Sequence, residues 1–268
     1  MTKVIILGNF GCLGHVVERY FREKGYDVIG LNRKDLDVSD FSKLDETIFT
    51  NTYSRMLKKK PDYVINCIGI LNGYKDVQKY GDINVALPRL LAHIANRDKL
   101  WKLIHVSTNC IFDTIGPHNT NSQPNATDLY GMSKALGEIN DDWNLTIRTS
   151  IIGPELKKEG TGLLHWFMNK SGEEVEGYIN ALWNGVTTLQ LAKFIEECIK
   201  NNTTNLVNYH TIIPITKIDL LRIINRVYDL KKRIKYGYNN KIKSSLLNGV
   251  CTTTTYENQL KELKEWYK

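Results

Sequence analysis

Short β-branched runs alternate with segments of helical apolar spacing over the first 150 residues, and this alternation limits the fold more than any other feature of the chain. The runs predict strands, and the segments between them predict helices. The strands are expected at residues 3–7, 27–31, 62–66, 103–107 and 145–148, and the helices at 11–24, 41–58, 82–96 and 129–141. Repeated strand and helix units build parallel sheets with helices on both faces. The sequence therefore predicts an α/β fold with a Rossmann-like, doubly wound parallel sheet.

The regular alternation ends at Pro154. The later segments predict helices at 163–170, 189–200 and 218–228, a strand at 206–209 and a closing amphipathic helix at 256–267. We expect residues 1–155, with a returning segment at about 186–205, to form the Rossmann-like domain. Residues 156–185 and 206–268 are expected to form a smaller mixed α/β C-terminal cap.

Cysteine spacing and apolar runs exclude several classes of protein. The five cysteines include no CxxC pair, so neither a zinc knuckle nor a secreted disulfide framework is expected. No basic segment precedes the first apolar run, and no stretch of 18 apolar residues follows it. We therefore expect a cytoplasmic protein with reduced thiols and no membrane partner.

Positive charge is concentrated near the C-terminus. The net charge is +7, and residues 200–268 hold 13 Lys and Arg against 5 Asp and Glu. A nucleic-acid patch, a site for an anionic small molecule and a solvated face all fit this balance, and charge alone favours the solvated face. No nucleic-acid partner is expected, because no binding motif with suitably spaced stacking aromatics is present.

A glycine-rich turn follows the first predicted strand directly. Residues 8–14 read GNFGCLG, which has the spacing GxxGxxG. Glycines in this context let the backbone turn tightly and approach a pyrophosphate at a helix N-terminus. A tight turn without a ligand is the alternative interpretation.

Two cations follow the second predicted strand, where dinucleotide-binding folds place the group that contacts the ribose. An acid there binds the 2′-hydroxyl of NADH, and an arginine binds the 2′-phosphate of NADPH. Asn32, Arg33 and Lys34 include no acid, so NADPH is favoured. The alternative is that Arg33 and Lys34 are ordinary solvated residues.

Tyr130 and Lys134 are four residues apart at the start of a predicted helix, which places both side chains on one face. A nearby ammonium is expected to lower the pKa of the phenol, so that Tyr130 donates a proton to a developing alkoxide near neutral pH. Ser107 and Thr108 end the preceding predicted strand, at the sheet edge where such folds bind ligands. Thr108 is expected to hydrogen-bond the same carbonyl oxygen.

Together these motifs resemble the extended short-chain dehydrogenase/reductase superfamily, and within it the dTDP-4-dehydrorhamnose reductase group. The resemblance covers most of the chain. Besides the glycine-rich turn it rests on NCIG at 66–69, VSTNCIFD at 106–113, residues 130–138, RTS at 148–150 and GVTTL at 185–189. It implies an enzyme that binds NADPH and a nucleotide-diphosphate sugar, with the cap holding the substrate.

The resemblance also implies the roles of individual residues. It makes Thr108, Tyr130 and Lys134 the catalytic set. The residues implied to bind the cofactor are Gly8, Phe10, Gly11, Cys12, Leu13, Gly14, Asn32, Arg33, Asp37, Cys67, Ile68, Gly69, Asn84, Tyr130, Lys134 and Ile151. Those implied to bind the substrate are Asn109, Cys110, Trp166, Trp183, Asn184 and Val186.

Some positions depart from the usual pattern of the group. Asn109 stands where the reductases usually carry an acid, and Ile151 replaces a common aromatic residue, so the sugar is left open. Dehydratases of the superfamily carry an Asp-Glu pair after the catalytic Thr, and Asn109 with Cys110 cannot replace it. Epimerases that retain NAD generally carry an acid after the second strand, and Asn32 with Arg33 argues against that class.

Cys110 matches the cysteine that bifunctional epimerase/reductases such as GDP-fucose synthase place two residues beyond the catalytic Ser or Thr. Their opposing acid/base is a His or Lys after the fifth strand, and His165 is the candidate here. A thiol and an imidazole on opposite faces of a sugar can remove and return the proton beside a 4-ketone. A buried cysteine beside a helical histidine is the plainer interpretation and is favoured. The remaining histidines show no metal-binding spacing and are interpreted as ordinary: His15, His93, His105, His118 and His210.

The resulting hypothesis is an NADPH-dependent reductase for the 4-keto group of a dTDP- or UDP-linked 6-deoxy-4-hexulose in deoxysugar biosynthesis. Added 3-epimerase activity and a homodimer are left open, and no metal is expected. One alternative is a non-catalytic NADP-binding subunit resembling the regulatory subunit of methionine adenosyltransferase. Another is an NAD-dependent nucleotide-sugar epimerase. The intact set of Thr108, Tyr130 and Lys134 favours an enzyme.

Overall fold

A parallel sheet forms the centre of the molecule in the computed structural model, which describes residues 1–36, 38, 58–172, 174–240 and 244–268. Among these residues seven strands pair in parallel in the order β13-β10-β5-β4-β3-β1-β2. They are β1 (Lys3–Leu7), β2 (Asp27–Leu31), β3 (Tyr63–Asn66), β4 (Lys102–Val106), β5 (Leu145–Arg148), β10 (Asn205–Thr211) and β13 (Val250–Thr252). The predicted doubly wound α/β fold is thereby confirmed. The strand order reverses at β1, which pairs with β2 on one side and with β3 on the other.

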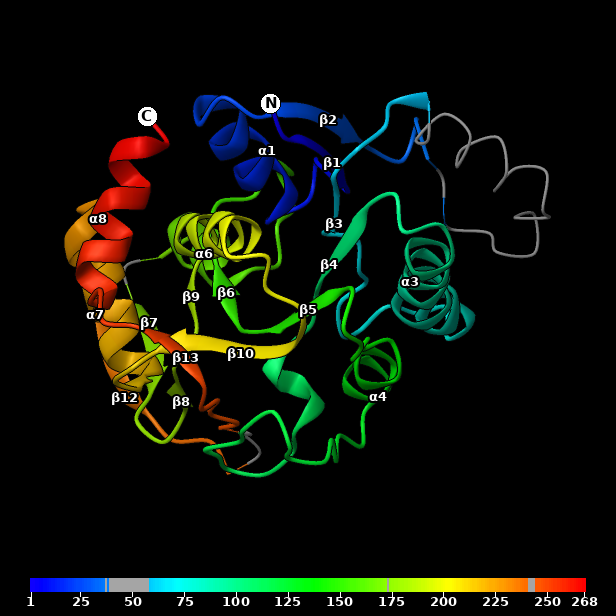
Figure 1. Cartoon of the computed structure of the whole chain (residues 1–268). Coiled ribbons are helices and arrows are strands. Elements are labelled where there is room, and N and C mark those ends of the chain that lie inside the picture. Colours follow the sequence, from blue (N-terminus) through cyan, green and yellow to red (C-terminus); the bar gives the residue numbers. More distant parts are fainter. Residues whose placement is uncertain (37, 39–57, 173, 241–243) are drawn as a thin grey trace.

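Side chains of β1 alternate between two apolar cores, one on each face of the sheet. Val4 and Ile6 join the core that contains α1 and α6, whereas Ile5 and Leu7 join the core that contains α3. Figure 1 shows these helices on opposite faces, with α4 on the side of α3. The helices are α1 (Gly14–Glu23), α3 (Leu87–Asp98), α4 (Leu129–Leu136), α5 (Leu163–Asn169), α6 (Thr188–Lys200), α7 (Lys217–Tyr228) and α8 (Tyr256–Trp266). A strand that is buried on both faces needs a continuous apolar run, which residues 4–7 provide.

Four helices begin at a residue whose side chain caps the first turn. Asp128 caps α4, and Thr187, Thr216 and Thr255 cap α6, α7 and α8, each by accepting a backbone N–H three residues further on. Such caps satisfy N–H groups that the helix itself leaves unpaired. The starts predicted for α6 and α7 from the sequence are correct to within one residue.

A smaller mixed layer lies beside one end of the sheet, where Figure 1 shows α7 with the strands β7, β8 and β12. The strands pair as β6 (Ile151–Ile152) with β9 (Val186–Thr187), β7 (Glu174–Tyr178) with β12 (Arg233–Gly237), and β8 (Leu182–Trp183) with β11 (Ile215–Thr216). Strands β6, β8, β9 and β11 have two residues each, which is too short for an alternation pattern, and the sequence does not predict them for this reason.

The cap boundary expected at residue 206 needs a correction. It cuts through β10, which pairs with β5 in the main sheet, and β13 then pairs with β10. β5 pairs with β4 on one side, and β10 pairs with the backbone N–H and C=O groups on its other edge. The main sheet therefore takes up the strand that was assigned to the cap. The expected helix at 41–58 lies almost wholly outside the described residues.

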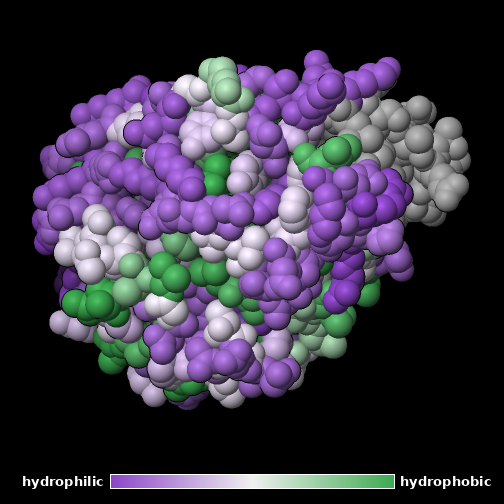
Figure 2. All heavy atoms as spheres, in the orientation of Figure 1, coloured by the Kyte–Doolittle hydropathy of each residue, from purple (hydrophilic) through white to green (hydrophobic). Residues whose placement is uncertain are grey.

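The surface drawn in Figure 2 is mostly hydrophilic, with apolar side chains in separated groups. Within the part of the chain that the structure describes, no helix is both long enough and apolar enough to span a bilayer.

Candidate active site

The carboxyl ends of β1, β3, β4 and β5 lie at one edge of the sheet, because these strands are parallel neighbours. Each end is followed directly by a motif that the sequence analysis singled out: residues 8–14, 67–69, 107–110 and 149–152. The structure thus gathers these motifs beside the reversal of strand order. Doubly wound folds bind their ligands at this position.

The glycine-rich turn is packed so closely that two of its glycines have no room for a side chain. Gly8 has a φ of +77°, in the region that favours glycine, and its N–H donates to the Leu31 carbonyl at 2.8 Å. A Cβ on Gly14 would lie 2.2 Å from the Gly8 carbonyl oxygen. Because α1 begins at Gly14, its unpaired N–H groups and the positive end of its dipole lie at this turn. The turn therefore fits a pyrophosphate, which needs close backbone approach and positive potential.

The other residues of the turn differ in exposure. Phe10 is exposed and Leu13 is buried. Burial raises the pKa of the Cys12 thiol to about 12, with a smaller contribution from Glu155. Cys12 is therefore an unreactive thiol that lines the turn.

The residues after β2 form a short turn held by Asn32. Its side-chain oxygen accepts the Lys34 N–H at 2.8 Å, and its own N–H donates to the Asp35 carboxylate at 3.0 Å. Arg33 and Lys34 are both exposed, and the turn adjoins Leu31, which binds Gly8. The two cations thus stand beside the glycine-rich turn. Asp37, expected to bind the cofactor, lies outside the described residues.

The segment after β3 packs against the glycine-rich turn. A Cβ on Gly8 would lie 2.9 Å from the Ile68 side chain. Burial raises the pKa of the Cys67 thiol to about 12, while Lys134 lowers it. Cys67 and Ile68 therefore lie between the turn and Lys134.

Asn84 ties the segment after β3 to α4. It lies in the π-helix η1 (Tyr80–Ala86), where the sequence predicted the first part of a continuous helix. Its side chain accepts the Ile70 N–H at 3.0 Å and donates to the Ser133 hydroxyl at 3.0 Å. π-helical segments often occur at functional sites. In this one, the buried Asn84 side chain uses both its oxygen and its nitrogen in hydrogen bonds.

Tyr130 and Thr108 lie near each other at the carboxyl edge of the sheet, where the Thr108 hydroxyl also accepts the Cys110 N–H at 3.2 Å. Burial raises the pKa of Tyr130, Cys110 raises it further, and the nearby Thr108 hydroxyl lowers it. The lowered pKa expected from the sequence is thus corrected, because burial outweighs the other influences. A raised pKa keeps the phenol protonated, which a proton donor requires.

Lys134 lies on the same helix and is 4% exposed. Its ammonium donates to the Val106 carbonyl at 2.9 Å and lies 3.4 Å from Nε2 of His105. The far nitrogen of that ring, Nδ1, lies 3.2 Å from the Asn66 side-chain nitrogen. His105, interpreted as ordinary from the sequence, is therefore in direct contact with Lys134.

A buried ion pair fixes the strands beneath these residues. Arg148 donates twice to Glu138, with Nε at 2.9 Å from Oε1 and Nη2 at 2.7 Å from Oε2. Ser107 donates to the same Oε1 at 2.6 Å. The Arg148 and Glu138 side chains are 4% and 8% exposed. These contacts connect the end of β5 with the segments that follow β4 and α4.

Three residues expected to bind the substrate make internal contacts. Asn109 donates to the Ser245 carbonyl at 2.8 Å, and Asn184 exchanges two hydrogen bonds with Leu247, at 2.7 and 3.2 Å. Val186 is fully buried. The two amides fix the segment at residues 244–247 against the edge of the sheet.

Cys110, Trp183 and Lys217 gather on the cap side of the site. Trp183 donates its indole N–H to the Ser150 hydroxyl at 2.7 Å, and Nζ of Lys217 lies 5.2 Å from the centre of the Trp183 ring. Burial lowers the pKa of Lys217 to about 8, and the proximity of Cys110 raises it. Lys217 was missed from the sequence because a lysine at a helix start resembles any solvated residue.

His165, for which the sequence left open a pairing with Cys110, has a hydrogen-bond partner in its own preceding loop. Its Nε2 lies 3.1 Å from the Lys158 carbonyl, and a Cβ on Gly160 would lie 2.6 Å from the ring. The ring is therefore engaged by its own preceding loop. Trp166 is 38% exposed. The charge of Lys217 is influenced by Cys110.

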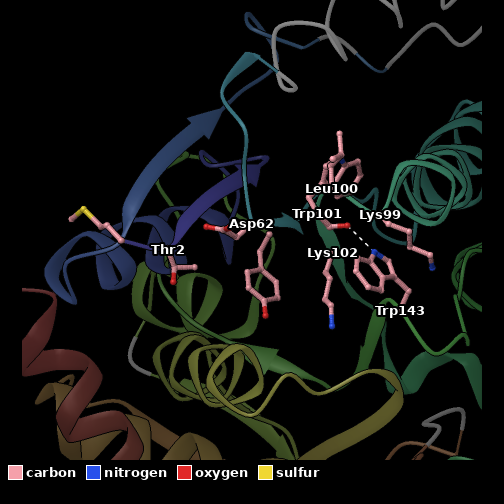
Figure 3. Close-up of a pocket in the computed structure, with 9 residues that line it drawn as sticks. Thr2, Asp62, Lys99, Leu100, Trp101, Lys102 and Trp143 are labelled. Carbon is pink, nitrogen blue, oxygen red and sulfur yellow. Dashed lines mark hydrogen bonds between the residues drawn. The ribbon is translucent and has the colours of Figure 1, made fainter.

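A separate pocket of about 490 Å³ opens at the opposite, amino-terminal edge of the sheet (Figure 3). Thr2, Asp62 and Trp101 each precede a strand, and Trp143 donates to the Trp101 carbonyl at 2.8 Å. None of the predicted site residues lines this pocket, so it is not part of the candidate active site.

Comparisons with known proteins agree with this arrangement. The family model described as RmlD substrate binding domain matches residues 1–204. The chain belongs to this family. The match confirms the resemblance that the motifs indicated, and it covers most of the chain.

The individual proteins that this RmlD family member resembles share low sequence identity with it. SpsK, a spore coat polysaccharide biosynthesis protein of Bacillus subtilis, is 27% identical over 143 residues, which are 52% of this chain and 47% of SpsK. The chain thus matches about half the length of that relative. The crystal structure of a dTDP-4-dehydrorhamnose reductase from Clostridium acetobutylicum has a TM-score of 0.81 and 21% identity, covering 99% of both chains. That of the Bacillus anthracis reductase, in complex with NADP, has a TM-score of 0.80 and 18% identity over the whole of both chains.

Proposed function

We propose that this protein uses NADPH to reduce the 4-keto group of a dTDP- or UDP-linked 6-deoxy-4-hexulose in deoxysugar biosynthesis. The observation that carries the proposal is the position of Tyr130 near Thr108 at the carboxyl edge of the sheet, beside a glycine-rich turn that fits a pyrophosphate. Membership of the RmlD family supports the class of substrate. The bound NADP of the Bacillus anthracis reductase supports the cofactor.

The chemistry of the site follows from the properties of its side chains. The dinucleotide, when bound, supplies the hydride. The Thr108 hydroxyl orients the carbonyl oxygen, and Tyr130 transfers its proton to that oxygen as negative charge develops there. Lys134 adds positive charge on the same face of α4. Its low exposure strengthens this electrostatic effect, because little water screens it.

The substrate-binding side of the site combines an indole with a buried cation. Lys217 is partly buried, and its ammonium lies over the Trp183 ring without a hydrogen-bond or carboxylate partner among the described residues. A buried charge without a partner is costly, so an anionic or carbonyl oxygen of the substrate would stabilise it. We place the sugar between Thr108, Cys110 and Trp183, with Lys217 as its cationic contact.

A substrate panel tests this function directly. Purified protein is incubated with NADPH and with dTDP- and UDP-linked 4-keto-6-deoxy sugars, and the products are identified by NMR. We expect NADPH oxidation and reduction at C4 with at least one of these sugars. Binding of NADPH with no turnover of any sugar would instead support the non-catalytic subunit. Interconversion of sugars with NAD and without net reduction would support the NAD-dependent epimerase.

Arg33→Ala should weaken NADPH binding by about 10- to 100-fold and leave NADH binding nearly unchanged, because charge-assisted hydrogen bonds to the 2′-phosphate are available only in NADPH. Isothermal titration with both cofactors measures the two affinities. Arg222→Ala, a change of an exposed arginine on the cap helix α7, is the matched control. Equal losses of both cofactors would show that Arg33 does not contact the phosphate.

Epimerisation beside the ketone is a second candidate activity, favoured by the proximity of Cys110 to Lys217. In this proposal the Cys110 thiol and the Lys217 amine remove and return the proton on the carbon next to C4. Lys217 thus takes the role that the sequence suggested for His165. Serine cannot replace the thiol, because its hydroxyl is far less acidic.

Cys110→Ser should therefore abolish deuterium incorporation beside C4 in heavy water and still reduce an already epimerised sugar. NMR of the product gives both results. His165→Gln and Cys251→Ser should keep the incorporation, since the His165 ring is hydrogen-bonded to the Lys158 carbonyl and Cys251 lies on the outer strand β13. A wild-type product without deuterium at that carbon would identify a plain 4-reductase.

A further inference from the structure

The ring of His105 is enclosed between the catalytic lysine and a buried amide. His105 is 1% exposed and Asn66 is fully buried. Burial, together with the charge of Lys134, holds the pKa of His105 well below its usual value, so the ring is neutral. A neutral imidazole carries one N–H and one bare nitrogen. The position of that single proton decides how the ring acts on Lys134.

The hydrogen bonds of Asn66 determine which ring nitrogen is bare. Its Oδ1 accepts the Ile68 N–H at 3.1 Å, so its Nδ2 is the atom that faces His105, at 3.2 Å from Nδ1. A carboxamide nitrogen is only a donor. Nδ1 must therefore accept, and the ring proton is on Nε2.

This proton is directed at the side-chain nitrogen of Lys134, 3.4 Å away. An ammonium has three donors and no acceptor, whereas a neutral amine offers a lone pair. The Val106 carbonyl, 2.9 Å from the same nitrogen, accepts in either state. When Lys134 is neutral, its lone pair accepts the Nε2–H of His105 and every group has a partner. When Lys134 is charged, its N–H donors face the Nε2–H donor of His105.

We propose that Asn66 fixes His105 as the Nε2–H tautomer, and that the two act as positioning residues which hold Lys134 close to losing its proton. Burial acts in the same direction and lowers the pKa of Lys134 to about 8. Glu138, which Arg148 and Ser107 hold, raises that pKa, as does Cys67 from the segment after β3. The ammonium is therefore present below about pH 8 and is lost as the pH rises through this value.

The sign of one substitution tests the proposal. If His105 opposes the charge on Lys134, His105→Leu should move the titration midpoint of Lys134 upward by about one pH unit. If the ring accepts a hydrogen bond from the ammonium, the same change should move it downward. The midpoint is measured by NMR on protein with ¹³C at the lysine ε-carbon, and the signal is assigned by its loss in Lys134→Met. His93→Leu, at an exposed position on α3, should leave the midpoint unchanged. A midpoint that is unchanged or lowered in His105→Leu would overturn the proposal.

A second measurement needs no variant at this buried position. The ¹⁵N chemical shifts of histidine-labelled wild-type protein distinguish a bare Nδ1 from a bare Nε2, and we expect a bare Nδ1 for His105. A bare Nε2 above pH 8 would also overturn the proposal.

The effect on turnover rests on the proposed function, whereas the two NMR results do not. The fall of kcat/KM at alkaline pH should move upward in His105→Leu together with the Lys134 midpoint. If the NMR results are as expected and no 4-keto sugar is reduced, the tautomer stands and the proposed function fails. If sugars are reduced and Lys134 titrates unchanged in His105→Leu, the function stands and the role of His105 fails.

Discussion

Tyr130→Phe should lower kcat by about 10²- to 10⁴-fold, the usual contribution of a positioned general acid. The lost hydroxyl acts only as the carbonyl oxygen becomes an alkoxide, so NADPH affinity should remain nearly unchanged. Single-turnover kinetics with a 4-keto sugar, together with a separate NADPH titration, measure the two quantities. The ring itself is retained, which limits the change to one hydrogen-bonding group next to Thr108.

Tyr236→Phe is a suitable control, because Tyr236 is 73% exposed on β12. This substitution removes the same kind of hydroxyl from a surface position. Its turnover should match the wild type. Retention of wild-type turnover within a few-fold by Tyr130→Phe would exclude Tyr130 as the proton donor.

Arg148→Met should lower the free energy of unfolding by about 3–5 kcal/mol, because it leaves the buried Glu138 carboxylate without its cation. Methionine preserves most of the side-chain volume, so the loss reports the charge rather than a cavity. Chemical denaturation at pH 7 measures this value. Ser107 would still donate to the same carboxylate, but a single hydroxyl cannot replace two charge-assisted hydrogen bonds.

The pair of Arg226 and Glu257 provides the matched comparison. These side chains are 62% and 32% exposed, so Arg226→Met should change stability far less than Arg148→Met. Replacing Glu138 by glutamine in the Arg148→Met background should recover part of the loss, since the unpaired charge is removed. Equal effects of the two arginine substitutions would contradict the structural role given to the buried pair.

Local patterns allowed the centre of the fold to be predicted from the sequence. β1 and β2 have the predicted bounds, because each is a short apolar run between turns. The glycine-rich turn and the spacing of Tyr130 and Lys134 were also recognisable, since both depend on residues close together in the chain. The sheet edge then brings these motifs together through strand order alone.

Contacts between distant segments could not be predicted in the same way. His105 reads as one residue of an apolar strand, and only the positions of Asn66 and Lys134 on neighbouring elements give it a role. Lys217 acquires its surroundings from Trp183 through the pairing of β8 with β11, two strands of two residues each. The place of His165 after the fifth strand suggested a partner for Cys110, but the loop before α5 engages its ring.

The outer strands β10 and β13 come late in the chain and yet complete the main sheet beside β5. An enzyme whose substrate range is to be altered by exchanging caps therefore cannot receive residues 206–268 of a relative as one block. Such a chimera would carry foreign strands against β5, and a truncated one would leave a strand with buried side chains as an open edge. Open edges of this kind pair with other chains and aggregate. The segments suited to exchange are those between the sheet strands, at 156–185 and 212–237, with both outer strands left in place.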